Sequence, residues 1–99
     1  MDVNHIQKVY AKLKQHPRLC FKTPLLENME APYKDVLPTQ VASLSLKLET
    51  MQYTGSFKIR GCMNQFLSLL VKDVERKRPL VTISCGNYGK AFLFLELPF

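Results

Sequence analysis

The chain has few cysteines and no long apolar run, and both shortages narrow the classes of protein to which it can belong. Its 99 residues contain three cysteines, Cys20, Cys62 and Cys85, and no Cys-x-x-Cys pair. An odd number of widely spaced cysteines argues against a disulfide framework or a structural metal site, and it favours a reducing compartment. No stretch is apolar for long enough to span a bilayer, and the N-terminus lacks the apolar region of a secretion signal. The expected location is therefore the cytoplasm.

The sequence also lacks the features of a nucleic-acid-binding domain. Its net charge is +6, but the basic residues are spread out, and the only dense run is Arg-Lys-Arg at 76–78. A run of this kind between two regular elements is usually a solvated connection. There is no zinc-ligand spacing or stacking-aromatic motif that would support contacts to bases. We expect no nucleic-acid partner, no membrane partner and no metal ion.

What the sequence does contain is hydrophobic periodicity typical of a small α/β domain. Apolar residues recur at helical spacing in 3–14, residues 41–49 alternate as in a strand, residues 56–72 return to helical spacing, and residues 80–83 form a short buried-type strand. A strand, a helix and a strand make a βαβ unit, whose two strands are expected to be parallel. We therefore predict one α/β domain over residues 1–99: an N-terminal helix and a βαβ unit of an open, incomplete parallel sheet.

Two polar motifs follow the two predicted strands. Lys58 lies in Ser-Phe-Lys-Ile-Arg-Gly (56–61), and residues 84–87 read Ser-Cys-Gly-Asn. In parallel sheets, ligands bind outside the carboxyl ends of the strands. We therefore expect both motifs at one edge of the sheet, with the side chain of Lys58 pointing toward residues 84–87.

The chemistry of these motifs suits an aldehyde cofactor and an anionic substrate. A lysine amine can form a Schiff base with pyridoxal phosphate, and a helix N-terminus disfavours the protonated amine. Phe57 could pack against the cofactor ring. The turn at 84–87 offers N–H groups and a hydroxyl to a carboxylate. Taken singly, however, Lys58 is more typical of an ordinary exposed helix lysine, and the turn is more typical of a plain helix cap.

Together with a third motif, these segments resemble a known family. Residues 49–61 (ETMQYTGSFKIRG) resemble the cofactor-lysine signature of the serine/threonine dehydratases and serine racemases, which are tryptophan-synthase-β-like, fold-type-II pyridoxal-phosphate enzymes. Residues 23–25 (Thr-Pro-Leu) resemble the motif near the start of those enzymes, and residues 84–87 resemble their Ser-x-Gly-Asn substrate loop. The resemblance runs from about Ile6 to Lys90, with the three motifs in the family's order.

The resemblance implies pyridoxal 5'-phosphate as cofactor, with Lys58 as the Schiff-base lysine and Phe57 beside the cofactor. It implies that Asn87 bonds the 3′ oxygen of the cofactor. The substrate carboxylate would be held by the turn, which comprises Ser84, Cys85, Gly86 and Asn87.

The turn also departs from the family pattern. Cys85 stands at a variable position, where racemases carry a serine that acts as an acid/base on the face opposite Lys58, so a catalytic role for Cys85 follows by analogy. A small cysteine chosen for its size is the alternative. Tyr88 stands where the family usually has histidine, and Cys62 occupies a site that is usually small or aliphatic.

The implied activity is that of an amino-acid ammonia-lyase of the L-serine/L-threonine dehydratase type. Its substrate is a small amino acid, and the family's enzymes are expected to be homo-oligomers. The family's glycine-rich phosphate-binding loop is not found within the 99 residues, so we expect an N-terminal fragment that is inactive by itself. Its apolar tail, residues 91–99, is expected to pack poorly. Two alternatives remain: a non-catalytic truncated product that at most pairs with a full-length partner, and serine-racemase-type activity in the complete enzyme.

Overall fold

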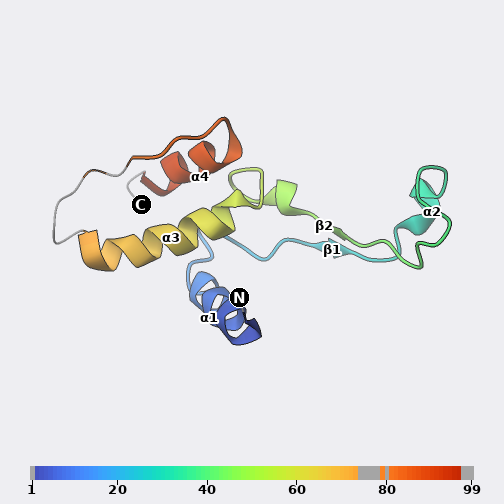
Figure 1. Cartoon of the computed structure of the whole chain (residues 1–99), viewed down its shortest axis with the longest axis horizontal. Coiled ribbons are helices and arrows are strands. Elements are labelled where there is room, and N and C mark those ends of the chain that lie inside the picture. Colours follow the sequence, from blue (N-terminus) through green and yellow to red (C-terminus); the bar gives the residue numbers. More distant parts are fainter. Residues whose placement is uncertain (1, 74–78, 80, 97–99) are drawn as a thin grey trace.

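The computed structural model describes residues 2–73, 79 and 81–96, and its longest element is a helix that carries the core (Figure 1). In chain order the elements are α1 (Val3–Leu13), β1 (Leu25–Leu26), α2 (Glu30–Tyr33), β2 (Leu46–Lys47), the 3₁₀ turn η1 (Glu49–Met51), α3 (Lys58–Asp73) and α4 (Asn87–Glu96). Helices α1 and α4 pack against α3, while β1, β2 and α2 form an arm that projects away from them. The radius of gyration is 17.0 Å, against about 13 Å for a compact domain of this size. The molecule is therefore elongated.

The predicted parallel βαβ unit is wrong for the described residues. The sheet that they form has two strands, β1 and β2, which pair antiparallel with Leu25 opposite Lys47. Only two residues of the predicted strand at 41–49 are in β2, and residues 81–84 have no regular structure. Leu80, where the second predicted strand begins, lies outside the described residues.

The partner of β2 explains this difference. Period-two alternation indicates an extended segment but does not choose its neighbour. Here the neighbour is the segment that follows Pro24, since the N–H of Leu48 donates to the carbonyl of Pro24 at 3.0 Å. The described part of the second predicted strand is largely uncovered, because Val81 and Ile83 are 87% and 96% exposed, while Thr82 is half-buried. Of the fold-class prediction, only the mixed content of helix and sheet is confirmed.

Two helices begin beside residues that cap them. Asp2 caps α1, because its carboxylate accepts the N–H of His5 at 2.7 Å. Ser56 caps α3 by accepting the N–H of Lys58 at 3.3 Å. The helices predicted over 3–14 and 56–72 are thus confirmed, and a further helix begins at Asn87. No helix among the described residues has both the length and the apolar character that crossing a bilayer would require.

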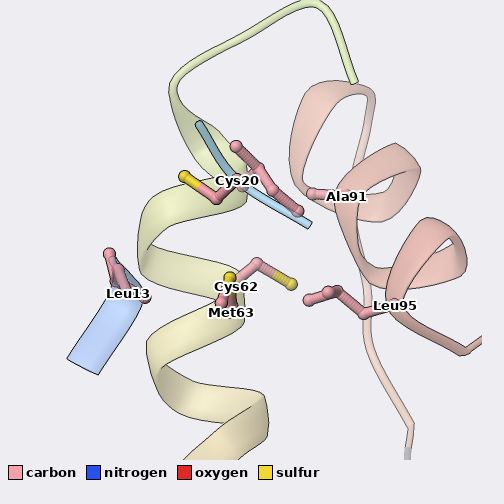
Figure 2. Close-up of a cluster of buried hydrophobic side chains, with 7 residues drawn as sticks. Leu13, Cys20, Cys62, Met63, Ala91 and Leu95 are labelled. Carbon is pink, nitrogen blue, oxygen red and sulfur yellow. The ribbon is translucent and has the colours of Figure 1, made fainter. Parts of the chain in front are cut away.

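The core lies on both sides of α3 (Figure 2). Its buried residues come from α1, from the segment after α1, from α3 and from α4: Leu13, Cys20, Ile59, Cys62, Met63, Ala91 and Leu95. The expectation that the tail packs poorly is therefore wrong for Ala91 and Leu95, because α4 lays one stripe of apolar residues against α3. It holds for Leu93, which is 65% exposed. Residues 97–99 lie outside the described residues.

Candidate functional site

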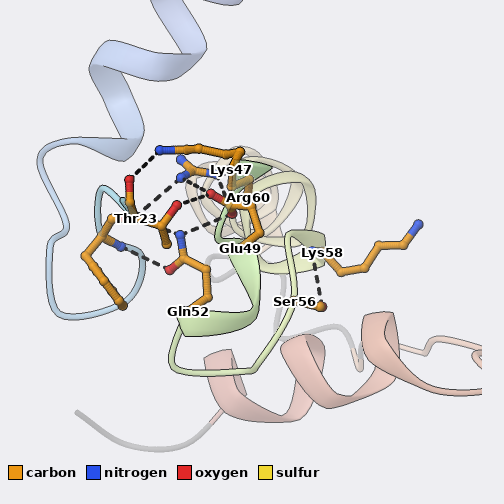
Figure 3. Close-up of polar contacts among 8 residues, drawn as sticks. Thr23, Lys47, Glu49, Gln52, Ser56, Lys58 and Arg60 are labelled. Carbon is orange, nitrogen blue, oxygen red and sulfur yellow. Dashed lines mark hydrogen bonds and ion pairs between the residues drawn. The ribbon is translucent and has the colours of Figure 1, made fainter. Parts of the chain in front are cut away.

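Lys58 occupies the first turn of α3 and is exposed to solvent. Its Nζ lies 5.0 Å from the centroid of the Phe57 ring, a cation–π distance. Phe57 is 59% exposed although it is a large apolar side chain. Figure 3 shows Lys58 extending from the start of α3 on the side opposite a cluster of polar residues. An accessible amine beside an uncovered aromatic ring is an arrangement that a planar, aldehyde-bearing cofactor fits.

The second predicted motif forms the turn that starts α4. The Oγ of Ser84 accepts the N–H groups of Gly86 at 3.2 Å and of Gly89 at 2.9 Å. One of the N–H groups expected to face an anion, that of Gly86, is thus used internally, together with that of Gly89 in the first turn of α4. Among the described residues, no acceptor is assigned to the hydroxyl proton of Ser84. Gly89 suits this approach, because a Cβ there would meet the Cβ of Ser84 at 3.2 Å. Cys85 and Asn87 are both exposed.

Helices α3 and α4 bring the two motifs to one end of the α3–α4 pair. They pack against each other, and in Figure 1 both begin at the end that carries the loop between η1 and α3. In that loop, a Cβ on Gly55 would lie 3.6 Å from the Nζ of Lys90, in the first turn of α4. The two motifs were predicted to lie at one edge of a parallel sheet. They instead lie at the N-termini of two neighbouring helices. The expected direction of the Lys58 side chain, toward residues 84–87, stays a prediction.

A largely buried polar cluster, here named the Glu49 cluster, lies on the other side of the start of α3 and consists of Thr23, Glu49, Gln52 and Arg60 (Figure 3). Arg60 donates two hydrogen bonds to the carboxylate of Glu49, from Nη2 at 2.7 Å and from Nε at 2.9 Å. Thr23 donates its hydroxyl to the same carboxylate at 2.6 Å, and Gln52 adds a contact of 3.3 Å. The cluster therefore joins two of the three motifs, the Thr-Pro-Leu segment and the lysine segment.

Glu49 and Arg60 are both charged at neutral pH. Hydrogen bonds from Arg60 lower the pKa of Glu49 to about 2, and burial opposes this shift without cancelling it. The hydrogen bond to Glu49 likewise raises the pKa of Arg60. The sequence motif contains both residues but predicts no role for them, because a separation of eleven residues shows no local pairing pattern such as i, i+4.

Tyr88 attaches the start of α4 to α3. Its hydroxyl donates a short hydrogen bond to the side-chain oxygen of Gln65. Burial and the neighbouring Cys62 raise the pKa of Tyr88, and burial raises the pKa of Cys62, so both side chains are protonated at neutral pH. The tyrosine that replaces the family's usual histidine thus has a structural contact of its own.

The described residues contain no cluster of side chains that could bind a metal ion. Among residues 2–73, 79 and 81–96, no three His, Cys, Asp or Glu side chains gather as a metal ion would require. Cys20 and Cys62 are buried free thiols in the core, and Cys85 is exposed in the turn.

Comparison with known proteins agrees with the motifs. A protein of Sinorhizobium fredii designated a threonine dehydratase is 35% identical over 94 residues, which are 95% of this chain and 25% of that protein. The catabolic L-threonine dehydratase TdcB of Staphylococcus aureus is 32% identical over 90 residues, 91% of this chain and 23% of its own. Human serine racemase is 47% identical over 53 residues, 52% of this chain and 16% of its own. The chain is a relative of the serine/threonine dehydratases.

This relationship confirms the family resemblance, but it covers only part of the length of the relatives. The chain spans about a quarter of the length of the curated relatives that it matches. No protein-family model matches it. No solved structure gives a significant match either, so the fold-type-II architecture stays an inference from the relatives.

Proposed function

We propose that these 99 residues provide the cofactor-lysine segment of a pyridoxal-phosphate-dependent ammonia-lyase that acts on L-serine or L-threonine. The observation that carries the proposal is the position of Lys58: an exposed amine in the first turn of α3, beside the Phe57 ring, at the end where the 84–87 turn starts α4. The relatives named above support the same assignment, since two of them are threonine dehydratases by name.

Each site residue has a role that its surroundings allow. Lys58 would hold the cofactor covalently and, once released, take the proton from the substrate Cα. Phe57 would cover one face of the cofactor ring with its exposed side chain. When bound, pyridoxal phosphate supplies an electron sink for negative charge at Cα, which is what allows a β-hydroxyl to leave as water.

The 84–87 turn would hold the amino-acid substrate. The oxygen of Ser84 accepts two N–H groups, so the group that Ser84 would offer to the substrate carboxylate is its hydroxyl proton. Gly86 would let the carboxylate approach the backbone. Asn87, exposed at the first position of α4, would donate its side-chain amide to the phenolic oxygen of the cofactor.

Selective labelling of Lys58 tests this proposal. The chain is incubated with pyridoxal 5'-phosphate and reduced with borohydride, and the labelled lysines are mapped by mass spectrometry. We expect label to concentrate on Lys58 and to disappear in Lys58→Ala. Lys90→Ala is the matched control, because Lys90 is an exposed lysine at the same end of the molecule. Equal labelling of all exposed lysines would overturn the proposal.

We further propose that the 99 residues alone do not complete a catalytic cycle. Their four glycines, Gly55, Gly61, Gly86 and Gly89, include no glycine-rich phosphate-binding loop, and a cofactor phosphate would have to be held by other residues. We therefore expect no ammonia release from L-serine or L-threonine by the isolated chain with added cofactor. Ammonia release that depends on Lys58 would contradict this statement and leave the role of Lys58 intact.

A racemase-type activity is the second candidate, and the exposure of Cys85 favours it. A cysteine chosen only for its size would be expected in the core, whereas Cys85 lies open in the turn. A thiol there could exchange a proton on the face of Cα opposite Lys58. The test grafts residues 84–87 into a full-length relative and compares Cα-proton exchange of the two serine enantiomers. Exchange rates unaffected by Cys85→Ala would exclude a catalytic role for the thiol.

A further inference from the structure

We infer that the Glu49 cluster is a positioning device, which aims Lys58 by fixing the rotation of α3 about its own axis where the helix begins. The inference rests on the proposed function, because it concerns how the cofactor-holding amine is directed. It assigns a role to four residues that the proposed chemistry does not use: Thr23, Glu49, Gln52 and Arg60.

Helix geometry couples Arg60 to Lys58. Successive residues of an α-helix are about 100° apart around the axis, so residues two positions apart point in nearly opposite directions. Figure 3 shows this arrangement, with Arg60 directed into the cluster and Lys58 directed away from it. Any rotation of the first turn of α3 moves both side chains, so an anchor on Arg60 also fixes the direction of Lys58.

The ion pair between Arg60 and Glu49 fixes the direction of the Arg60 side chain because it is bidentate. Two parallel N–H groups of the Arg60 guanidinium meet the two carboxylate oxygens of Glu49, at 2.7 and 2.9 Å. A planar fork resists rotation, whereas a lysine would make a point contact. The side chains are 27% and 14% exposed, so solvent screens the pair less than it screens a surface ion pair.

The other end of the anchor is fixed to a segment outside the lysine loop. Glu49 accepts the hydroxyl of Thr23, and the side-chain amide of Gln52 exchanges two hydrogen bonds with the backbone of Phe21, at 3.2 and 2.7 Å. Thr23 and Gln52 are only 2% and 4% exposed. A buried polar network is costly unless it is satisfied, and a satisfied one rigidifies its surroundings. The start of α3 is therefore held against residues 21–23.

The chain offers a matched control for this anchor. Lys12 of α1 also ties α3 down, through hydrogen bonds from its Nζ to Asn64 at 3.2 Å and to Ser68 at 3.1 Å. These contacts lie farther along the helix than Lys58. Removal of the Lys12 contacts should loosen the attachment of α3 without rotating its first turn.

The first measurement is the ratio of borohydride-trapped pyridoxal phosphate on Lys58 to that on Lys8, an exposed lysine of α1. We expect the ratio to fall about tenfold in Arg60→Met and in Glu49→Gln, because small misplacement of a reacting group is costly. Arg60→Lys keeps the positive charge but loses the two parallel N–H groups of the guanidinium. Its ratio should lie between that of these variants and that of the wild type. Lys12→Met should leave the ratio unchanged.

Thr23 provides a rescue experiment. Thr23→Val removes the hydroxyl at constant shape and should lower the ratio, while Thr23→Ser retains the hydroxyl and should restore it. Circular dichroism verifies that each variant keeps the helical content of the wild type. If only the shape of the side chain at position 23 mattered, the labelling ratio would instead be higher in Thr23→Val than in Thr23→Ser.

The second measurement does not use the cofactor. Lysines are dimethylated with ¹³C-formaldehyde. Because the Nζ of Lys58 lies 5.0 Å from the centroid of the Phe57 ring, we expect its signal to carry a ring-current shift. If the cluster sets the helix start, Arg60→Met and Glu49→Gln should move this signal toward that of Lys8, and Lys12→Met should not. A merely stabilising network would leave the signal in place in variants that remain folded.

The two measurements separate the possible failures. If wild-type Lys58 takes no preferential label but its signal moves in the cluster variants, the proposed function fails and the positioning role stands. If wild-type Lys58 is labelled and neither the ratio nor the signal changes in the cluster variants, the positioning role is overturned and the proposed function stands.

Discussion

Lys58 and Arg60 share one helical turn but lie in different environments, and this contrast defines the site at the scale of single residues. Lys58 is exposed beside an uncovered ring, whereas Arg60 is part of a largely buried network. The place of Lys58 in the first turn of a helix was predictable from the helical spacing that follows Ser56. The role of Arg60 was not, since its partner is distant in sequence and is chosen by the fold.

The acid dependence of stability tests the Glu49–Arg60 pair. The pKa of Glu49 is about 2 in the folded chain, below its ordinary value of 4.5. A lowered pKa means that the carboxylate stabilises the fold fully above pH 4.5, and that this contribution is lost as the pH falls through about 2. Allowing for partial solvent screening, we expect it to be worth about 2 kcal/mol at pH 7.

Urea unfolding of the wild type and of Glu49→Gln between pH 7 and pH 2 measures this contribution. The two curves of unfolding free energy should lie apart at pH 7 and converge toward pH 2, because the wild-type carboxylate is then becoming neutral as well. A constant difference at every pH would mean that the charge of Glu49 contributes nothing.

Tyr88 tests the contact between α4 and α3. Tyr88→Phe removes the hydroxyl that bonds Gln65 and keeps the ring, so unfolding should become easier by about 1 kcal/mol. Tyr88→His introduces the residue usual in the family and should lose the same contact. Thermal unfolding of both variants beside Gln65→Ala, in which Tyr88→Phe should add little further loss, measures the coupling.

At the scale of elements, helices were predictable and strands were not. The apolar spacing in 3–14 and 56–72 is a local signal, and α1 and α3 lie where this spacing predicts. The alternation in 41–49 is also local, but the identity and direction of its partner depend on non-local contacts. Lys58 and residues 84–87 were expected to meet because each follows a strand of a parallel sheet. The described residues do not form these strands, and the two motifs instead lie at the starts of α3 and α4.

Gly55 tests the junction between η1 and α3. Its φ of +77° lies in the region that favours glycine, and its N–H bonds the carbonyl of Gln52 at 2.8 Å. Gly55→Ala should therefore destabilise the chain by about 1 kcal/mol. Gly61→Ala is the matched control: Gly61 is helical, a Cβ there would have nothing within 4 Å, and alanine should be neutral or stabilising by up to about 1 kcal/mol. Chemical denaturation measures both, and equal effects would contradict the assigned backbone strain.

At the scale of the whole molecule, the helices and the arm have different means of support. Among the described residues, the buried apolar residues of the core lie in α1, in α3, in α4 and at Cys20, and none of them lies in the arm of β1, α2 and β2. The arm is held by a two-residue ladder and a few loop hydrogen bonds, such as that from Leu44 to Glu30 at 2.7 Å. Short two-stranded ladders are marginally stable in water. The arm should therefore open locally without unfolding of the helices.

Limited proteolysis measures this difference in local stability. Trypsin should cleave after Lys34, which is exposed at the end of α2, well before it cleaves after Arg60, which is held in the Glu49 cluster. In Glu49→Gln the order should stay the same but cleavage after Arg60 should come earlier, because the guanidinium loses its charged partner. Mass spectrometry of the timed fragments gives both rates. Cleavage after Arg60 that matches or precedes cleavage after Lys34 in the wild type would mean that the start of α3 opens as readily as the arm, and the cluster would then hold nothing in place.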